Sequence, residues 1–489
     1  MSAPKRFEAK LDEGRLKDLQ KRLDRACEDA ERNPEPTAVW EMDKKRYGMT
    51  HDRHRQLLFA WRDFLAGKSE QQQSLQNGQR PGADHDTWKA FEKKLNSFDH
   101  YTSQIEDVNL HFIWERASTD ARQRRPVIPL VLLHGWPSSI LDFANTIHPL
   151  AHPGSTSPSD VPAFDVVVPS HTGYLWSTSP KVDQFGRGQH SGPQGDILLK
   201  DEARLVHKLM LSLGYRKYVI QAGDWSNVVA RIMAQMFPDN VVALHLNFCP
   251  CGPPNLEIPL VHFASQFIPK PIKNLAWAFT PSPIATLIQN VIQFPAWRVR
   301  EHYLREPGTI DWLAHYFVGF PRPLNDQDRK KLQRAIPFIR TGSGYAIMQG
   351  TRPSTLGLVL QSDPAALLAW IGEKYIEWTD EDPSDAEICA QLTLYWCTDT
   401  MARSIYNYRN REQPTGSLPR TDPNLYINQP FGMSDFPFEI LPSPLDWMKR
   451  SGNLQWYRKH SKGGHFASME RPANYVEDIR DCFAKIWRP

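Results

Sequence analysis

A short segment near the middle of the chain places one acidic side chain at a tight turn between an apolar strand and a helix. The segment runs from Val219 to Asn227, with Asp224 at its centre and the small residues Ala222 and Ser226 on either side. This pattern is typical of a nucleophile elbow, in which small flanking residues let strand and helix approach each other. An aspartate at the centre predicts attack by a carboxylate. An aspartate that only caps the following helix also fits these residues.

A second segment favours the catalytic interpretation. The run His134-Gly135-Trp136-Pro137 directly follows an apolar stretch, Val127 to Leu133. In folds with a nucleophile elbow, the turn after an early strand and the residue after the nucleophile each supply a backbone N–H to an oxyanion hole. The expected donors are the backbone N–H groups of Trp136 and Trp225.

The remaining partners of such a nucleophile are expected near the C-terminus, because the chain order in this fold is nucleophile, acid, histidine. Of the 17 histidines, His465 is the expected base, since it follows Gly463 and Gly464 in a turn between a strand signal and a helix. Two carboxylates upstream, Asp435 and Glu439, are candidates for the acid that orients it.

The elements that must position these residues are short apolar runs separated by helical stretches. Such runs predict a parallel sheet covered by helices on both faces. The expected strands are Val127–Leu133, Phe164–Val168, Tyr218–Gln221 and Val241–Phe248, followed by Leu425–Ile427 and Leu454–Tyr457. The helix after the elbow is expected to bury one face that carries Val228, Val229, Ile232, Met233 and Met236.

Changes in composition divide the chain into four parts. Residues 1–115 form a polar, helix-rich N-terminal extension, with Leu16, Leu19 and Leu23 at helical spacing and a polar segment, 67–87, expected to be a mobile surface loop. Residues 116–254 and 416–489 are the two parts of an α/β core. Between them, residues 255–415 are rich in proline and tryptophan and predict a mostly helical cap.

Composition and charge exclude several classes of protein. The chain has 489 residues, 58 basic and 55 acidic, so its net charge of +3 is too small to indicate a nucleic-acid-binding protein. The six cysteines fit no metal-ligand or disulfide framework, and Cys249 and Cys251, separated by one proline, are too close for an ordinary disulfide. Free thiols in a reducing compartment and the lack of a long apolar run lead us to expect a cytoplasmic protein without a membrane span.

The motifs together resemble the microsomal-type epoxide hydrolases, especially their soluble fungal members. The likeness covers nearly the whole chain in the family's order. The N-terminal pieces that match are Leu95–Phe98 and Ile105-Glu106. The further matching segments are His134–Pro137, Gly223–Trp225, Gly344-Tyr345, Thr351–Gly357, Ala369–Tyr375, Tyr395-Trp396, Phe436–Glu439 and Gly463–Ala467.

The resemblance implies an α/β-hydrolase fold with a mostly parallel central sheet, a helical cap insertion and an N-terminal helical extension. It implies Asp224 as nucleophile, Glu439 rather than Asp435 as acid, and His465 as base. Tyr345 and Tyr408 match the two cap tyrosines that hold the epoxide oxygen in this family. It implies no metal or organic cofactor, an epoxide and water as reactants, and is compatible with a homodimer.

Three departures from the family pattern are visible in the sequence. Ser226 stands where many members have glycine, segment 67–87 is an insertion, and the membrane helix that precedes some animal relatives has no counterpart. Tyr406 lies close to Tyr408 and is expected to have only a packing role.

The chemistry explains why an aspartate would replace serine. A serine that opened an epoxide would become an ether, whereas a carboxylate becomes an ester that activated water can cleave. A haloalkane dehalogenase with the same aspartate nucleophile is the nearest alternative, and a catalytically inactive scaffold is a more distant one. Detoxification of xenobiotics, turnover of lipid epoxides and a step in secondary metabolism all fit the sequence.

Overall fold

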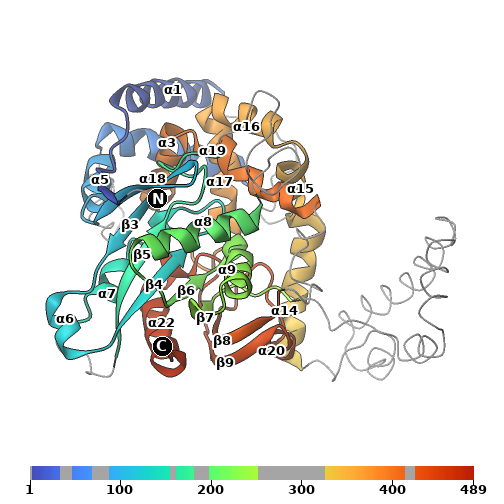
Figure 1. Ribbon diagram of the computed structural model, residues 1–489. Helices are drawn as coiled ribbons and strands as arrows, with labels where there is room; N and C mark the ends of the chain where they lie inside the picture. The colour runs from blue at the N-terminus through green and yellow to red at the C-terminus, as the bar shows by residue number, and fades with distance from the viewer. Residues whose placement is uncertain are drawn as a thin grey trace, which may run out of the picture.

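The computed structural model describes residues 3–33, 47–68, 87–154, 161–180, 198–251, 325–412 and 425–488. A central sheet lies between layers of helices, and a group of helices from the N-terminal and later parts of the chain covers one end of it (Figure 1). Most of the expected 67–87 loop, residues 69–86, lies outside the described residues. Residues 252–324 and 413–424, which overlap the two ends of the expected cap, also lie outside them.

The strands of the described residues form one nine-stranded sheet in the order β1-β2-β3-β5-β4-β6-β7-β8-β9. From β5 to β9 all neighbours are parallel, whereas β1, β2, β3 and β5 pair antiparallel. The sheet is therefore mostly parallel, as expected. The strands are β1 Lys5–Arg6, β2 His100–Ile105, β3 Val108–Glu115, β4 Val127–Leu133, β5 Ala163–Pro169, β6 Tyr218–Ala222, β7 Val241–Leu246, β8 Ile427–Asp435 and β9 Gly452–Lys459.

The register of the parallel strands brings distant segments to one edge of the sheet. Leu133, the last residue of β4, pairs with Ala222, the last residue of β6. The segments that follow these two residues, His134–Pro137 and Gly223-Asp224, therefore leave the sheet side by side. In parallel sheets this carboxyl edge is where binding and catalytic groups gather.

Both faces of the parallel part are buried under helices, which explains the continuous apolar runs. In β4, Leu130 and Leu132 belong to one core cluster, and Val131 and Leu133 belong to the other. One face is covered by α8 (Leu199–Ser212) and α9 (Asp224–Met236), and the other by α7 (Ile147–Ala151) and α22 (Pro472–Ile486). The shorter helices of the core are α6 Thr119–Arg124, η1 Ile140–Phe143, α20 Leu445–Arg450 and α21 Ala467–Glu470.

The N-terminal helices pack on the cap rather than on the sheet. Helices α1 (Glu13–Arg32) and α3 (His51–Ala66) contact α17 (Pro364–Glu377) and α18 (Asp385–Cys397), and these pairs lie side by side in Figure 1. The Trp61 indole N–H donates to Thr393 Oγ1 at 2.9 Å. The predicted apolar spacing in α1 is confirmed, because Leu19 and Leu23 are fully buried.

The part of the cap that the structure describes is helical, as predicted. In Figure 1 most of its pieces lie above α9, the helix of the elbow, and the first piece, residues 326–337, runs down the right side towards α20. Besides α17 and α18 they are α14 Asp326–Pro337, η3 Phe338–Gly342, α15 Gly344–Thr351, α16 Pro353–Ser362, α19 Thr400–Ser404 and η4 Ile405–Glu412. Within the described residues, no helix combines the length and apolar character that a bilayer span requires.

Three expectations about the elements need correction. The helix-rich N-terminal part, which also contains α5 (Trp88–Leu95), contributes β1, β2 and β3 to the sheet, and the sequence analysis did not foresee them. The strand predicted at Leu425–Ile427 begins only at Ile427 and continues to Asp435. On α9, Met236 is 43% exposed because it lies in the last turn of the helix, whereas Val228, Val229 and Met233 are buried.

The error in β8 has a packing cause. The strand contains Gly432, and a Cβ placed there would lie 2.3 Å from Cys482 Sγ on α22. The position therefore excludes the branched apolar residues by which strands are recognised in a sequence. A shift of register between Ile427 and Phe431 further interrupts the alternation.

Candidate active site

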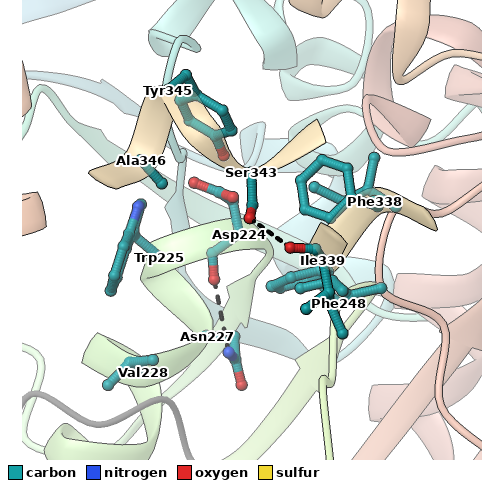
Figure 2. Close-up of a pocket in the computed structure, with 12 residues that line it drawn as sticks. Asp224, Trp225, Asn227, Val228, Phe248, Phe338, Ile339, Ser343, Tyr345 and Ala346 are labelled. Carbon is teal, nitrogen blue, oxygen red and sulfur yellow. Dashed lines mark hydrogen bonds between the residues drawn. The ribbon is translucent and has the colours of Figure 1, made fainter. Parts of the chain in front are cut away.

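Asp224 occupies a strained position at the first residue of α9. Its φ of 42° lies in the left-handed region that residues other than glycine rarely adopt. Strain of this kind is held in place by surrounding structure and is concentrated at functional sites. The turn carries the carboxylate away from the sheet and into a cavity below the cap (Figure 2).

The loop after β4 lies directly against this carboxylate. A Cβ on Gly135 would lie 2.3 Å from Asp224 Cβ, so only glycine allows the two segments to approach this closely. The backbone N–H of the next residue, Trp136, donates to Asp224 Oδ1 at 2.9 Å. Trp225 follows Asp224 in the first turn of α9, where backbone N–H groups have no acceptor within the helix. The Trp136 donor therefore contacts the carboxylate, and the Trp225 N–H stays a predicted donor on the residue that follows the nucleophile.

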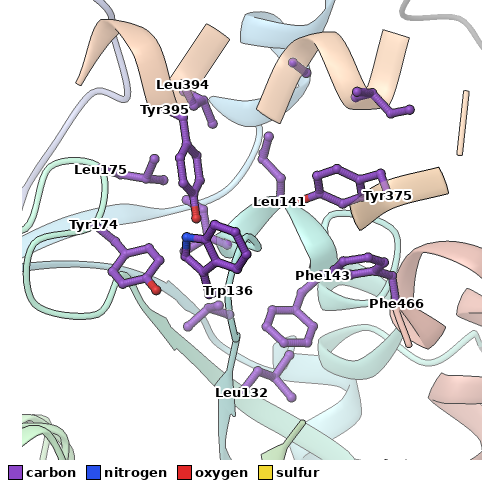
Figure 3. Packing of buried hydrophobic residues seen from close by; sticks show 14 of the residues in the cluster. Leu132, Trp136, Leu141, Phe143, Tyr174, Leu175, Tyr375, Leu394, Tyr395 and Phe466 are labelled. Atoms are coloured by element: carbon purple, nitrogen blue, oxygen red, sulfur yellow. The ribbon is translucent and has the colours of Figure 1, made fainter. Parts of the chain in front are cut away.

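Buried aromatic side chains fix the loop that carries Trp136. The Tyr375 hydroxyl donates to the Pro137 carbonyl oxygen at 3.3 Å, and the Tyr395 hydroxyl donates to the Ser138 carbonyl oxygen at 2.8 Å. Figure 3 shows Trp136 in the buried cluster to which these two tyrosines, Tyr174 and Leu132 also belong. The peptide bond between Trp136 and Pro137 is cis.

His465 and Glu439 form a pair that faces the nucleophile. His465 Nδ1 lies 2.6 Å from Glu439 Oε1, and His465 Nε2 lies 3.3 Å from Asp224 Oδ2. The backbone N–H of His465 donates to the Trp378 carbonyl oxygen at 2.8 Å, which ties the histidine loop to the cap helix α17. All three triad residues predicted from the sequence are thus brought together.

The competing acid, Asp435, is occupied elsewhere. It ends β8 and forms an ion pair with Lys331 of α14 at 2.5 Å. The Tyr457 hydroxyl donates to the same carboxylate. Glu439, four residues later, is therefore the carboxylate that reaches His465.

Two carboxylates beside one buried imidazole determine its protonation. Burial by itself would lower the pKa of His465, but the negative charges and hydrogen bonds of Glu439 and Asp224 outweigh burial and raise the pKa to about 10. With Asp224 ionised, His465 is therefore an imidazolium at neutral pH.

The two cap tyrosines lie above the carboxylate in an aromatic cluster. Tyr345, at the start of α15, stacks on Trp136 with ring centroids 5.4 Å apart, and Tyr408, in η4, packs edge-on against Trp225 at 4.9 Å. The rings of Tyr345 and Tyr408 are 5.9 Å apart. The Tyr408 hydroxyl is buried and has no hydrogen-bond partner among the described residues. Tyr406 is 40% exposed and does not join this cluster.

Burial keeps the Tyr408 phenol protonated. Together with the nearby Tyr345 and Asp224, burial raises its pKa well above the ordinary value. The other tyrosine has a cationic neighbour instead, since the buried Lys374 ammonium lies 4.6 Å from the centroid of the Tyr345 ring. An ammonium over an aromatic face is an attractive contact that also favours negative charge developing on the ring.

The cavity beside Asp224 has a volume of about 100 Å³. Asp224 points into it from below, and Tyr345 and Ser343 approach from the cap (Figure 2). Apolar side chains from both layers form most of the lining: Val228, Phe248, Phe338, Ile339, Ala346, Ile440 and Leu441. The described part of the site thus offers an apolar space with the Asp224 carboxylate at one end and the Tyr345 phenol at the other.

A second histidine pair behind the elbow was missed by the sequence analysis. His171 Nδ1 lies 2.7 Å from Glu202 Oε1, and its Nε2 lies 2.9 Å from both the Ser226 hydroxyl and the His134 carbonyl oxygen. The Ser226 hydroxyl also donates to the His134 carbonyl. Ser226 is therefore more than a small residue at the turn, because it links the elbow to the loop of the oxyanion donors. No sequence motif marks this network.

No cofactor was expected, and the triad needs none for its chemistry. One group of potential metal ligands occurs among the described residues, Glu115, His148 and His152, whose ligand atoms lie within 4.8 Å of one another. These residues belong to β3 and to α7 and its C-terminal cap, and none of them lines the cavity.

Two family models match the chain. Residues 4–143 match the model described as the epoxide hydrolase N terminus, and residues 128–296 match the model described as the alpha/beta hydrolase fold. The first match includes α1, β2, β3 and the His134–Pro137 loop, and the second includes the elbow.

Known proteins resemble the chain over most of its length. A Dothistroma septosporum protein assigned as an epoxide hydrolase is 30% identical over 414 residues, which cover 83% of this chain and 78% of that protein. Epoxide hydrolase 1 of Oryctolagus cuniculus is 26% identical and covers 97% of this chain and 87% of its own length. The structure of Aspergillus niger epoxide hydrolase superposes with a TM-score of 0.69 at 27% identity, covering 99% of this chain and 97% of the other.

Proposed function

This chain belongs to the epoxide hydrolase family, and we propose that it converts an epoxide and water into a vicinal diol through a covalent ester on Asp224. The observation that carries the proposal is the position of the Asp224 carboxylate. It lies at a left-handed elbow, 2.9 Å from the Trp136 N–H and 3.3 Å from His465 Nε2. A base and an oxyanion donor thereby contact a nucleophile that lines a cavity.

In the first step, Asp224 attacks a ring carbon of the epoxide, and the carbon–oxygen bond of the ring breaks. Tyr345 and Tyr408 hydrogen-bond the oxygen and supply the proton that the alkoxide takes up. Support comes from the buried Tyr408 hydroxyl, which lacks a partner among the described residues and is thus available to a ligand. General acid assistance of this kind contributes about 10²–10⁴-fold to a rate.

In the second step, water attacks the carbonyl carbon of the ester. Esterification removes the negative charge of Asp224, one of the two charges that raise the pKa of His465. The pKa of His465 then falls, and the imidazole, held by Glu439, can take a proton from water. The backbone N–H groups of Trp136 and Trp225 stabilise the oxyanion, at about 3–4 kcal/mol per donor. The proton that His465 released on esterification restores the tyrosine hydroxyl. Collapse of the intermediate expels the alkoxide, which takes the proton of the regenerated carboxyl group, so the diol leaves and the Asp224 carboxylate is restored.

The lining of the cavity supports an epoxide with an apolar substituent. Its described walls are formed mainly by the aliphatic and aromatic side chains on both sides of Asp224. Styrene oxide is therefore a suitable test substrate. Phenolic O–H donors opposite the nucleophile fit an epoxide oxygen, whereas the departing halide of a haloalkane requires N–H donors, so the dehalogenase alternative is disfavoured.

Trapping the ester tests the mechanism. In a His465→Gln variant the ester should form but not hydrolyse, so excess styrene oxide should raise the intact mass by that of one substrate molecule. Peptide mapping should place the added mass on Asp224, and an Asp224→Asn, His465→Gln double variant should gain none. A His465→Gln variant that turns over without gaining mass would exclude the covalent route.

From the free cysteines of the sequence we also propose that the enzyme acts in the cytoplasm, and from the family resemblance that it forms a homodimer. Fluorescence microscopy of a tagged chain tests the first statement. Sedimentation velocity across a range of concentrations tests the second, and a single monomeric species throughout would contradict it.

A further inference from the structure

Arg231, on α9, is a fully buried cation without a carboxylate partner. It is 1% exposed, and its guanidinium donates to Asn227 Oδ1 at 2.8 Å, to the Leu425 carbonyl oxygen at 3.0 Å and to Cys249 Sγ at 2.9 Å. Among the residues that the structure describes, no Asp or Glu forms an ion pair with it. A buried guanidinium stays charged, so the surrounding protein must supply the compensating negative charge.

Cys249 is the ionisable group in contact with this cation. It follows β7, and its sulfur lies 3.6 Å from that of Cys251 and 3.7 Å from Ser451 Oγ. The hydrogen bond from the Cys251 thiol, together with the charge of Arg231, lowers the pKa of Cys249 against the opposing effect of burial. The same contact raises the pKa of Cys251. The contacts with Arg231 and Cys251 therefore favour the thiolate form of Cys249 and the neutral thiol form of Cys251.

Three of the other cysteines have a different character. Burial raises the pKa of Cys27 to about 11 and that of Cys397 to about 12, and it raises the pKa of Cys482 as well. Reactivity follows the thiolate rather than the thiol. Cys249 is 2% exposed, whereas Cys251 is half-buried, so only a small reagent would reach the pair.

We propose that Cys249 and Cys251 form an oxidation site for small hydroperoxides. The Cys249 thiolate attacks the terminal O–H oxygen of the peroxide bond, which breaks; the sulfur is oxidised to a sulfenic acid. The other oxygen leaves as hydroxide from hydrogen peroxide, or as an alkoxide from an organic hydroperoxide, and takes up a proton to form water or an alcohol. The Cys251 thiol then attacks the sulfenic sulfur, and a disulfide forms with loss of water. The separation of 3.6 Å between the sulfurs is close to the approach distance of reacting atoms.

The spacing of one residue makes this disulfide transient rather than permanent. A disulfide with unfavourable geometry is strained and more easily reduced. A low-pKa thiolate next to a resolving thiol is also the pattern of reversible thiol oxidation. The site is separate from the epoxide chemistry, since neither sulfur lines the cavity beside Asp224.

Oxidation at this site is coupled to the hydrolase through two contacts, and this coupling rests on the proposed function. Phe248, which precedes Cys249, lines the cavity and packs edge-on against His465 with centroids 5.3 Å apart. The backbone N–H of Cys251 donates to Ser443 Oγ at 2.8 Å, in the segment that follows Glu439. Drawing the sulfurs together would shift both contacts and lower the rate of epoxide hydrolysis.

The test treats the intact protein with hydrogen peroxide and reads thiol chemistry by mass spectrometry, independently of activity. In the wild type we expect the loss of two hydrogens and a peptide map that links Cys249 to Cys251. In Cys251→Ser the sulfenic acid should persist and take up one dimedone molecule, whereas Cys249→Ser should show neither product. Cys482→Ser is the matched control and should behave as the wild type does.

The wild-type peptide map keeps the test decisive if a variant fails to fold. An oxidised wild type with both sulfurs still reduced, or with another cysteine modified first, would overturn the proposal. Dimedone capture at Cys249 in the wild type with no disulfide would overturn the resolving role of Cys251. Full oxidation with unchanged diol formation would overturn the coupling. A protein that forms the disulfide but produces no diol even before oxidation would count against the proposed function instead.

Discussion

Two histidine–glutamate pairs lie on opposite sides of the elbow, and they have nearly the same geometry. His465 lies 2.6 Å from Glu439, and His171 lies 2.7 Å from Glu202. Each imidazole presents its second nitrogen to a residue of the elbow, since His465 faces Asp224 at 3.3 Å and His171 faces Ser226 at 2.9 Å. By distance alone, either set would be a catalytic triad.

The two pairs differ in the groups that surround Nε2 of each histidine. His465 Nε2 faces the Asp224 carboxylate, which opens into the cavity below the cap tyrosines. His171 Nε2 faces the buried Ser226 hydroxyl and the His134 carbonyl oxygen, and none of these residues lines the cavity. A triad is therefore recognised by the access of its nucleophile to substrate. We call His465 and Glu439 the open pair, and His171 and Glu202 the closed pair. The closed pair is suited to holding the loop that carries Trp136 in place.

Replacing the two glutamates should give the largest difference between the pairs, because one change should lower kcat and the other should lower stability. Glu439→Gln should lower kcat by about 10³–10⁴-fold, because the imidazole loses the carboxylate that orients it and stabilises its charge. Glu202→Gln should instead cost about 3 kcal/mol or more of unfolding free energy, because it removes one member of a buried pair. Steady-state kinetics and urea unfolding of both variants provide the measurement. A large loss of kcat in folded Glu202→Gln would contradict the assignment of roles.

Replacing the cap tyrosines should change the reaction at Asp224, beside the open pair, and leave the closed pair unaffected. Tyr408→Phe and Tyr345→Phe should each slow ester formation by about 10²-fold or more, because the epoxide oxygen loses an acid. Rapid-mixing kinetics with styrene oxide measures this step apart from hydrolysis. The exposed Tyr406 is the matched control, so Tyr406→Phe should leave the rate unchanged. Equal effects of all three substitutions would indicate packing rather than acid catalysis.

The open pair should also make the free energy of unfolding depend on pH. The pKa of His465 is raised to about 10 in the folded enzyme, against about 6.5 for an unperturbed histidine. The stability it contributes is present in full below about pH 6.5 and is lost as the pH rises towards 10, with a slope of at most about 1.4 kcal/mol per pH unit. Denaturant unfolding from pH 6 to 10 should show this decline, and His465→Gln should flatten it. A decline of equal slope in the variant would exclude His465 as its source.

The smallest effect is expected at the serine of the closed pair. Ser226→Ala removes the hydroxyl that contacts His171 and the His134 carbonyl, and it should cost about 1–2 kcal/mol of stability with little change in kcat. Ser226→Gly should cost about 1 kcal/mol more because glycine weakens a helix. If either variant lost activity in proportion to Asp224→Asn, the closed pair would have a catalytic role.

The open pair and the strands around it could largely be predicted from the sequence. The core strands were predicted because strands buried on both faces are continuous apolar runs, and the elbow was predicted because its small residues flank one nucleophile. His465 was identified from its glycine turn, whereas Glu439 and Asp435 could be separated only by the family resemblance. The structure explains that choice, since Asp435 is held by Lys331.

What the sequence could not predict depends on contacts between distant segments. In β2 four of the six residues are polar, so the segment lacks a strand pattern, whereas Val108–Phe112 of β3 alternates apolar and polar residues and is a strand signal that the sequence analysis missed. The pairing of β3 with the distant β5 depends on folding. Tyr345 and Tyr408 come together only because α15 and η4 pack on each other. His171 and Glu202 are ordinary polar residues in the sequence, 31 positions apart, and only folding makes them a pair.

The covalent role of Asp224 is tested most directly by one turnover in water enriched in heavy oxygen, with enzyme in excess over styrene oxide. If Asp224 forms the ester and water attacks its carbonyl carbon, the first diol takes its new oxygen from the unlabelled carboxylate. The label should then appear in the peptide that contains Asp224. Label that enters the diol in this first turnover, with none in Asp224, would show direct attack by water and contradict the account.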